Sequence, residues 1–171
     1  IAKLDLTEEM KPKVDNEYDE ITEYQEVDQK EKLKSKWARL EAIVGTKERV
    51  KLIAKDIVDH FEKRQKAQEI DGGKGMIVAM SRRIAVDLYK EITDLRPDWH
   101  SDDLMKGKIK VVMTGKSSDE ESMQPFIGTK ASRETISKRM KDVNDELELV
   151  IVRDMWLTGF DVPSLATMYV Y

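Results

Sequence analysis

The sequence predicts a three-layer α/β domain in which helices cover both faces of a mostly parallel sheet. Short apolar runs alternate with segments whose apolar residues recur at helical spacing, which is typical of βαβ units joined by right-handed crossovers. The runs are continuous rather than alternating, as expected for strands that are buried on both faces. In open α/β sheets, ligands bind at the carboxyl ends of such strands.

Four apolar runs are expected to form the strands, and the first, third and fourth of them are expected to be buried. They cover residues 76–80, 109–114, 149–152 and 166–171. Helical patterns separate the first three runs, whereas a polar loop separates the last two. The order strand, helix, strand, helix, strand, strand is the basis of the α/β prediction.

Three amphipathic helices are predicted around these strands. Thr46 is expected to cap the first, Ser81 to cap the second, and residues 132–143 to form most of the third. Each helix carries an apolar stripe that we expect to face the sheet. The stripes are Val50, Ile53, Ala54, Ile57, Val58 and Phe61 in the first helix, Ile84, Ala85, Leu88, Tyr89, Ile92 and Leu95 in the second, and Ile136, Met140 and Val143 in the third.

Residues 1–45 differ from the rest of the chain in charge and form a predicted acidic linker and helical segment. They hold 12 acidic and 8 basic residues, which accounts for the whole net charge of −4. Residues 1–30 are expected to be extended, with a helix after them that ends at Gly45. Its predicted apolar face is Leu33, Trp37, Leu40 and Val44. Residues 46–171 are the predicted folded lobe.

The composition limits the chemistry that this chain can perform. Cysteine is absent and only two histidines occur, so disulfides and thiolate metal sites are excluded and no zinc site is expected. No apolar run approaches the ~20 residues of a membrane span, and we expect a cytoplasmic protein. The chain begins with Ile and stops after its last predicted strand, so we expect a fragment truncated at its carboxyl end.

Two weak motifs are rejected because the residues that would complete each pattern are missing at the required spacing. Gly115-Lys116-Ser117 resembles the end of a phosphate-binding P-loop, but the glycine needed five residues earlier is replaced by Lys110 inside a predicted strand. We interpret it as an ordinary turn. Pro97-Asp98 could open a metal-dependent nuclease pattern, but no acidic-x-Lys triplet follows it, so no nuclease site is expected.

Two positions at strand ends are stronger candidates for ligand contact. Ser81-Arg82-Arg83 begins a helix, where free N–H groups favour phosphate; the alternative is a Ser cap with solvated arginines. Arg153-Asp154 interrupts a buried strand with charge, and Gly159 and Asp161 follow it. The alternative there is that Arg153 and Asp154 pair with each other while Asp161 caps a turn.

Three segments resemble a known family. They are residues 76–90 (MIVAMSRRIAVDLYK), 110–115 (KVVMTG) and 151–163 (IVRDMWLTGFDVP). They resemble the R (motor and nuclease) subunit of type I restriction enzymes, within the second RecA-like lobe of its superfamily-two helicase motor. The resemblance is close over residues 46–171 and looser over 1–45.

The resemblance implies roles for individual residues. Ser81 and Arg82 match the fourth helicase motif, which contacts the nucleic-acid backbone. Arg153, Asp154 and Thr158 match the part of the fifth motif that faces DNA, although generic members carry Thr in place of Arg153. Gly159 and Asp161 match the part that borders the ATP ribose.

The resemblance also implies what lies elsewhere in the subunit. ATP and Mg²⁺ would be bound with the P-loop and acidic motif of the first RecA-like lobe, while the arginine finger and nuclease site come from other segments. Expected partners are double-stranded DNA, the first lobe, and the methyltransferase and specificity subunits. This segment alone is expected to bind no cofactor and to catalyse nothing. The alternatives are a lobe of another superfamily-two translocase, for repair or remodelling, and a non-enzymatic subunit-docking module.

Overall fold

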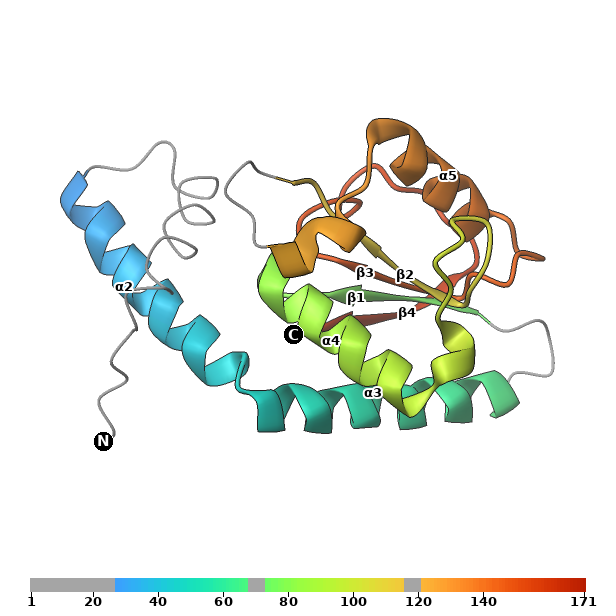
Figure 1. Ribbon diagram of the computed structural model, residues 1–171, viewed down its shortest axis with the longest axis horizontal. Helices are drawn as coiled ribbons and strands as arrows, with labels where there is room; N and C mark the ends of the chain where they lie inside the picture. The colour runs from blue at the N-terminus through green and yellow to red at the C-terminus, as the bar shows by residue number, and fades with distance from the viewer. Residues whose placement is uncertain (1–26, 68–72, 116–120) are drawn as a thin grey trace. The chain divides into compact units, whose positions relative to one another are not determined.

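A computed structural model of the chain describes residues 27–67, 73–115 and 121–171 (Figure 1). The contacts divide the chain into two compact units, residues 1–49 and 50–171. The expected domain boundary between residues 45 and 46 stays a prediction, because the division falls inside helix α3 (Lys47–Ala67).

Helix α2 (Val27–Val44) is the described part of the first unit. It begins before the expected start, so residues 27–30 are helical rather than extended, and residues 1–26 lie outside the described residues. The predicted apolar face is confirmed only in part: Trp37 and Val44 are half-buried, but Leu40 is 51% exposed whereas Ala38 and Glu41 are 2% and 4% exposed. The leucine spacing pointed to one side of the helix, and the buried side follows the smaller Ala38 instead.

The second unit contains a four-stranded sheet in which every described pair of strands is parallel. The strands are β1 (Lys74–Val78), β2 (Ile109–Val112), β3 (Leu149–Val152) and β4 (Leu165–Val170), in the order β2-β3-β1-β4. This confirms the predicted α/β class with a parallel sheet. β1 and β3 have strand neighbours on both sides and are almost entirely buried.

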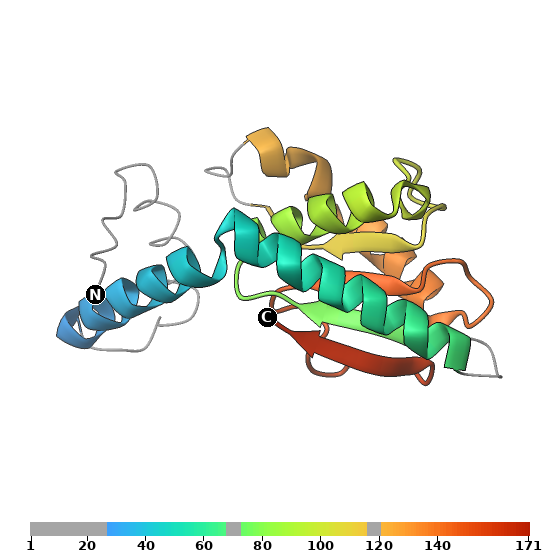
Figure 2. The ribbon, with the colours of Figure 1, turned by 90° about the horizontal axis from the view of Figure 1, so that it is seen from below.

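Helices cover both faces of the sheet, as Figures 1 and 2 show. α3 and α4 (Arg82–Leu95) lie on one face, and α5 (Lys130–Lys141) lies on the other. Two short 3₁₀ helices, η1 (Pro97–Trp99) and η2 (Glu121–Phe126), connect them to the strands. A β-carbon on Gly75 would lie 2.7 Å from Leu149 and 3.1 Å from Phe61 of α3, so the glycine allows α3 to pack closely on the sheet.

The predicted stripes of α3 and α4 are largely confirmed, and Ser81 is confirmed as a cap. Its hydroxyl accepts a hydrogen bond from the N–H of Ile84 at 3.2 Å. The Thr46 hydroxyl instead donates to the Ile43 carbonyl at 3.5 Å. Val143 was expected in the core, but α5 ends two residues earlier and leaves it 50% exposed.

β4 is not the buried strand that its apolar sequence predicts. Its side chains alternate between half-buried and exposed, with Met168 51% and Val170 80% exposed. β4 is the outer strand of the described sheet, and α3 covers one face of it. Tyr169 on that face has its hydroxyl 2.8 Å from Nδ1 of His60 in α3.

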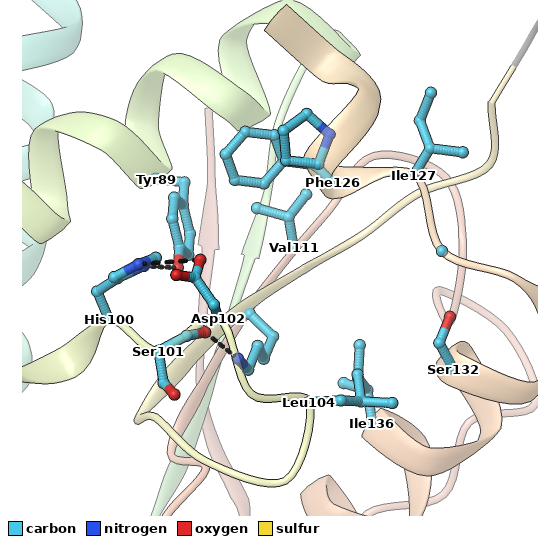
Figure 3. Close-up of a pocket in the computed structure, with 13 residues that line it drawn as sticks. Tyr89, His100, Ser101, Asp102, Leu104, Val111, Phe126, Ile127, Ser132 and Ile136 are labelled. Atoms are coloured by element: carbon cyan, nitrogen blue, oxygen red, sulfur yellow. Dashed lines mark hydrogen bonds and ion pairs between the residues drawn. The ribbon is translucent and has the colours of Figure 1, made fainter.

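β2 is the other outer strand of the described sheet, and a cavity of 330 Å³ lies along it. The cavity lies among α4, η2, α5 and the loop after η1 (Figure 3). Burial raises the pKa of Tyr89 in its wall to about 12, with the Asp102 carboxylate adding to the effect. The Tyr89 hydroxyl therefore stays protonated at neutral pH, 2.7 Å from Nδ1 of His100.

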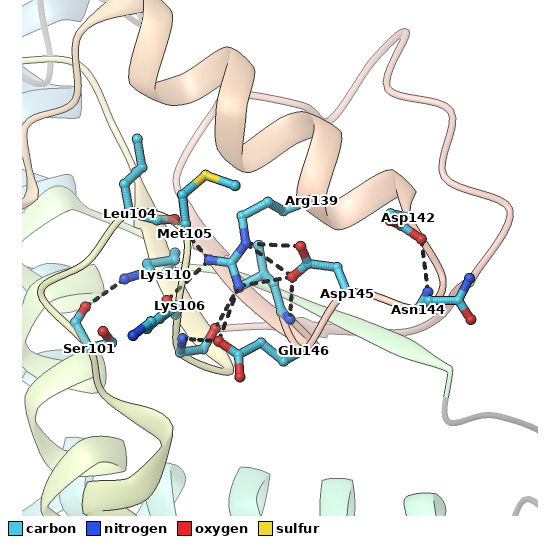
Figure 4. Close-up of polar contacts among 12 residues, drawn as sticks. Ser101, Leu104, Met105, Lys106, Lys110, Arg139, Asp142, Asn144, Asp145 and Glu146 are labelled. Atoms are coloured by element: carbon cyan, nitrogen blue, oxygen red, sulfur yellow. Dashed lines mark hydrogen bonds and ion pairs between the residues drawn. The ribbon is translucent and has the colours of Figure 1, made fainter.

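Arg139 of α5 joins the segments that lead into β2 and β3 (Figure 4). Its side chain is 3% exposed and lies 2.8 Å from an Asp145 carboxylate oxygen. Its guanidinium also donates to three backbone carbonyls in the loop before β2. These are Leu104 at 2.9 Å, Lys106 at 3.1 Å and Gly107 at 3.2 Å.

The Asp145 carboxylate is stabilised in its charged form. Burial alone would raise the pKa of Asp145, but hydrogen bonds from Arg139 and from the N–H of Leu147 lower it overall. A lowered folded-state pKa stabilises the fold above the usual carboxyl pKa of about 4. This contribution is lost as the pH falls through the lowered pKa.

Replacing Arg139 with Met is expected to lower the free energy of unfolding by about 3 kcal/mol. The variant removes the ion-pair partner of Asp145 and the guanidinium donor of three carbonyls, and removal of one partner of a buried ion pair typically costs about 3–5 kcal/mol. Urea unfolding measures the change. Lys138→Met, on the exposed side of the same helix, is the control and should stay within about 0.5 kcal/mol of the parent. Equal stability of the two variants would contradict this role.

Candidate functional site

The candidate site lies at the carboxyl edge of the sheet, where the ends of three strands are aligned. Val152 at the end of β3 pairs in register with Val78 of β1 and with Val112 of β2. The N–H of Ala79 continues the ladder by donating to the Val152 carbonyl at 2.8 Å. The residues directly after each strand therefore meet at one edge, as expected from the sequence.

Ser81 and Arg82 lie at this edge and are buried. Ser81 is 0% exposed and uses its hydroxyl as the cap of α4. Arg82 is 7% exposed, and its Nη1 donates to the carbonyl of Thr114, after β2, at 3.2 Å. This contact ties the end of β1 to the end of β2. The predicted DNA contacts of both residues stay predictions.

Arg83, next in the chain, differs from its neighbour. Its side chain is 24% exposed and makes an ion pair with Asp87, one turn along α4, at 3.3 Å. Of the two adjacent arginines, one therefore joins strand ends and the other is partly open to solvent. The sequence alone did not distinguish these positions.

Arg153 and Asp154 follow β3 and contact each other. Arg153 is 8% exposed, and its Nη1 lies 3.4 Å from a carboxylate oxygen of Asp154. The Asp154 side chain is 63% exposed, so the pair extends from the buried strand end to solvent. The mutual pairing that the sequence left open as an alternative is present, and it reduces the cost of burying the guanidinium.

Thr158, Gly159 and Asp161 lie on the exposed loop between β3 and β4. In the described part of the chain, neither the Thr158 nor the Asp161 side chain makes a hydrogen bond or ion pair. Gly159 has φ of 69°, and a β-carbon there would meet nothing within 4 Å. The side chains of Thr158 and Asp161, and the backbone between them, are therefore accessible to a ligand.

An aromatic pair holds this loop against the core. The rings of Trp156 and Phe160 stack with centroids 4.2 Å apart and an interplanar angle of 14°. Both pack against the apolar cluster that α5 forms with the sheet. The Lys141 ammonium lies 5.3 Å from the centre of the Phe160 ring. Trp156 has φ of 66°, a left-handed conformation that is unusual for a bulky residue.

The turn that resembles a P-loop has a packing role at its glycine. A β-carbon on Gly115 would lie 2.5 Å from Cγ2 of Ile127, so Gly115 allows Ile127 to approach the end of β2. Lys116 and Ser117 lie outside the described residues. Among those described, no cluster of three or more His, Asp or Glu side chains could hold a metal ion, and no helix is long and apolar enough to cross a membrane.

Sequence reasoning missed three buried cations at the opposite edge of the sheet. Burial lowers the pKa of Lys74 and of Lys110, although nearby carboxylates oppose the shift. Lys74 donates to the Arg139 carbonyl at 2.9 Å, and Lys110 donates to the carbonyl of Ser101 at 2.6 Å. The position of Arg139, three residues after Ile136 on the apolar side of α5, was the only signal of this arrangement.

Comparison with known proteins identifies relatives of this chain. A family model described as type I restriction enzyme subunit R domain 3 matches residues 116–171. The type I restriction enzyme HindI endonuclease subunit of Haemophilus influenzae is 50% identical over 129 residues, covering 75% of this chain and 12% of the relative. The putative type I restriction enzyme MjaIXP endonuclease subunit of Methanocaldococcus jannaschii is 45% identical over 172 residues. The match covers 99% of this chain and 15% of the relative.

The chain thus spans less than a sixth of the length of these two relatives. The string RDMWLTGFD, which carries the resemblance in the sequence, lies within the region matched by the family model. This match favours a restriction subunit over a repair or remodelling translocase. The chain belongs to the family of type I restriction enzyme R subunits, as a segment of such a subunit.

Proposed function

We propose that this segment is the second RecA-like lobe of an ATP-dependent DNA-translocating motor, in a subunit that also cleaves DNA. The observation that carries the proposal is the carboxyl edge, where buried Arg82 and Arg153 lie and where the exposed loop that bears Thr158 and Asp161 begins. Ligands of open α/β sheets bind at such edges. The relatives are named endonuclease subunits of type I restriction enzymes, which supports DNA as the substrate.

Gly159 and Asp161 form the nucleotide side of the proposed site. The Asp161 carboxylate is exposed and has no partner in the described fold, so it is available to accept hydrogen bonds from the ribose of ATP. Gly159 leaves open space through which the nucleotide can approach the backbone. The P-loop and the acidic residues that hold Mg²⁺ would come from the first lobe, with ATP between the two.

Thr158 and the Arg153-Asp154 pair form the DNA side of the proposed site, together with the amino terminus of α4. The Thr158 hydroxyl is exposed and can contact a backbone phosphate. Ser81 and Arg82 would act by shaping the edge, because Ser81 caps α4 and Arg82 joins two strand ends. Closing and opening of the two lobes around ATP would then move double-stranded DNA along this edge.

The intact subunit would work with methyltransferase and specificity subunits in the cytoplasm, where its DNA substrate occurs. Phosphoryl transfer requires the phosphates, the metal and positively charged groups to be positioned together. This segment has neither a P-loop nor a group of metal ligands in its described residues. It therefore supplies contacts to a shared site rather than a complete catalytic centre.

Asp161→Ala in the full-length subunit is expected to lower DNA-stimulated ATP hydrolysis about tenfold. Loss of one charge-assisted hydrogen bond typically costs about 1.5 kcal/mol, and the Asp161 side chain makes no hydrogen bond or ion pair with the described residues. Steady-state ATPase assays at saturating DNA measure this. Glu134→Ala, an exposed carboxylate on α5, is the control. An unchanged rate with normal translocation would remove Asp161 from the mechanism.

Thr158→Ala in the full-length subunit is expected to weaken binding of double-stranded DNA about fivefold, equally for unrelated sequences. A neutral hydrogen bond is worth about 1 kcal/mol, and phosphate contacts carry no base information. The salt dependence should not change, because a hydroxyl displaces no counterion. Thr135→Ala on α5 is the matched control. A loss confined to one DNA sequence would contradict a phosphate contact at Thr158.

The 171-residue chain by itself is expected to show no ATP hydrolysis above background, with or without DNA. The reason is that residues for only one side of the nucleotide site are present. A coupled ATPase assay on repurified chain measures the rate. Turnover that co-purifies with the chain through a second column and disappears in Asp161→Ala would show that the segment holds a complete site.

A further inference from the structure

β2 has a strand neighbour on one side only within the described residues. β3 pairs with it along its length, whereas on the other side a single bridge joins Met113, just after the strand, to Ile127. The 330 Å³ cavity borders this second side of β2 (Figure 3). The cavity lies away from the candidate nucleotide and DNA residues, none of which lines it.

The hydrogen-bond alternation of the sheet shows which backbone groups of β2 face the cavity. The N–H of Leu149 in β3 donates to the carbonyl of Lys108 at 2.9 Å, which fixes the phase of the ladder. Backbone groups in a strand alternate between its two sides. Lys110 and Val112 therefore bond to β3, and the N–H and C=O of Val111 both point away from it.

Val111 is 7% exposed and is one of the cavity-lining residues. Within the described residues, no backbone hydrogen bond joins Val111 to the segments on the open side of β2. A buried donor and acceptor on one residue need partners, and a neighbouring strand about 4.8 Å away supplies both. The free side of β2 is thus a template for strand pairing.

The side walls of the cavity also suit a strand. Phe126 packs against Tyr89 on the wall formed by α4 and η2, with ring centroids 5.1 Å apart. Leu104 and Ile136 line the opposite wall (Figure 3). Side chains of an inserted strand would point alternately to these two apolar walls. The apolar side chains on both walls favour apolar residues in an extended segment, although His100, Ser101 and Asp102 add polar groups to the lining.

We propose that this cavity is a docking slot in which an extended apolar segment of the same R-subunit polypeptide, from outside residues 1–171, pairs with β2. β2 has four residues, so the paired length is only about 13 Å. Such a short contact binds weakly unless a covalent tether raises the effective concentration into the millimolar range. The chain covers only 12–15% of its relatives' length, so most of an R subunit is available to supply the segment.

The test is residue-resolved hydrogen exchange on the full-length R subunit alone. The amide of Val111 is expected to exchange within about tenfold of the rates of Lys110 and Val112, whose amides are bonded to β3 or point toward it. Those two amides report the stability of the sheet itself. Rapid exchange at Val111 while its two neighbours stay protected would overturn the proposal. So would protection of Val111 that appears only when a second copy or other subunits are added.

A cavity-filling variant separates strand docking from simple burial. Ser132 lines the cavity and is half-buried, so Ser132→Trp places a large side chain in the slot. Val111 should then exchange at least tenfold faster, with Lys110 and Val112 unchanged. Lys138→Trp, on the exposed side of α5, is the matched control and should leave all three rates as they are.

Unchanged protection at Val111 in Ser132→Trp would show that no strand occupies the slot. The outcome is independent of ATPase activity and DNA binding, because none of the proposed ligand contacts lies in the cavity.

Discussion

The parallel register of β1, β3 and β2 determines where Ser81, Arg82 and Arg153 lie. Val78, Val152 and Val112 are aligned across the sheet, so the chain leaves all three strands at one edge. A shift of one residue in either pairing would turn the strand's side chains to the opposite face and destroy the packing of both helical layers. The same packing that buries the strands therefore fixes the arrangement of Arg82 and Arg153.

The opposite edge of the sheet is held by buried cations instead of ligand-binding groups. Arg139 bonds to the segments before β2 and β3. Lys74 bonds to carbonyls of α5 and of the segment before β3, and Lys110 bonds to the loop after η1. Most of their partners are backbone carbonyls, which cannot titrate and cannot move without moving the strands. Cations on the binding edge have different surroundings, because Arg153 pairs with the largely exposed Asp154. One edge is thus fixed by buried cations bonded mostly to carbonyls, while the other carries a buried guanidinium whose carboxylate partner is open to solvent.

The continuous apolar runs predicted all four strands with small errors at their ends. The predicted burial of β4 was wrong for a physical reason: an apolar sequence does not show whether a layer covers it, and Met168 and Val170 are exposed. Because Ser81, Arg82 and Arg153 each follow a strand, the sequence correctly predicted that they share one edge of the sheet. It could not show that Arg82 is buried, since its partner Thr114 lies more than thirty residues away in the sequence. The slot beside Val111 could not be predicted either, because local periodicity in the sequence does not show the order of the strands in the sheet.

The loop between β3 and β4 shows how an exposed site can still have a defined shape. Trp156 adopts a left-handed backbone conformation that costs roughly 1–3 kcal/mol in a non-glycine residue. Stacking on Phe160 and packing on the α5 side of the sheet offset that cost, because aromatic burial contributes energy of similar size. The aromatic pair flanks Thr158 and Gly159, and Val162, just after Asp161, is buried in the same cluster. The ligand-facing residues are therefore open to solvent, while the chain on both sides of them is fixed in the core.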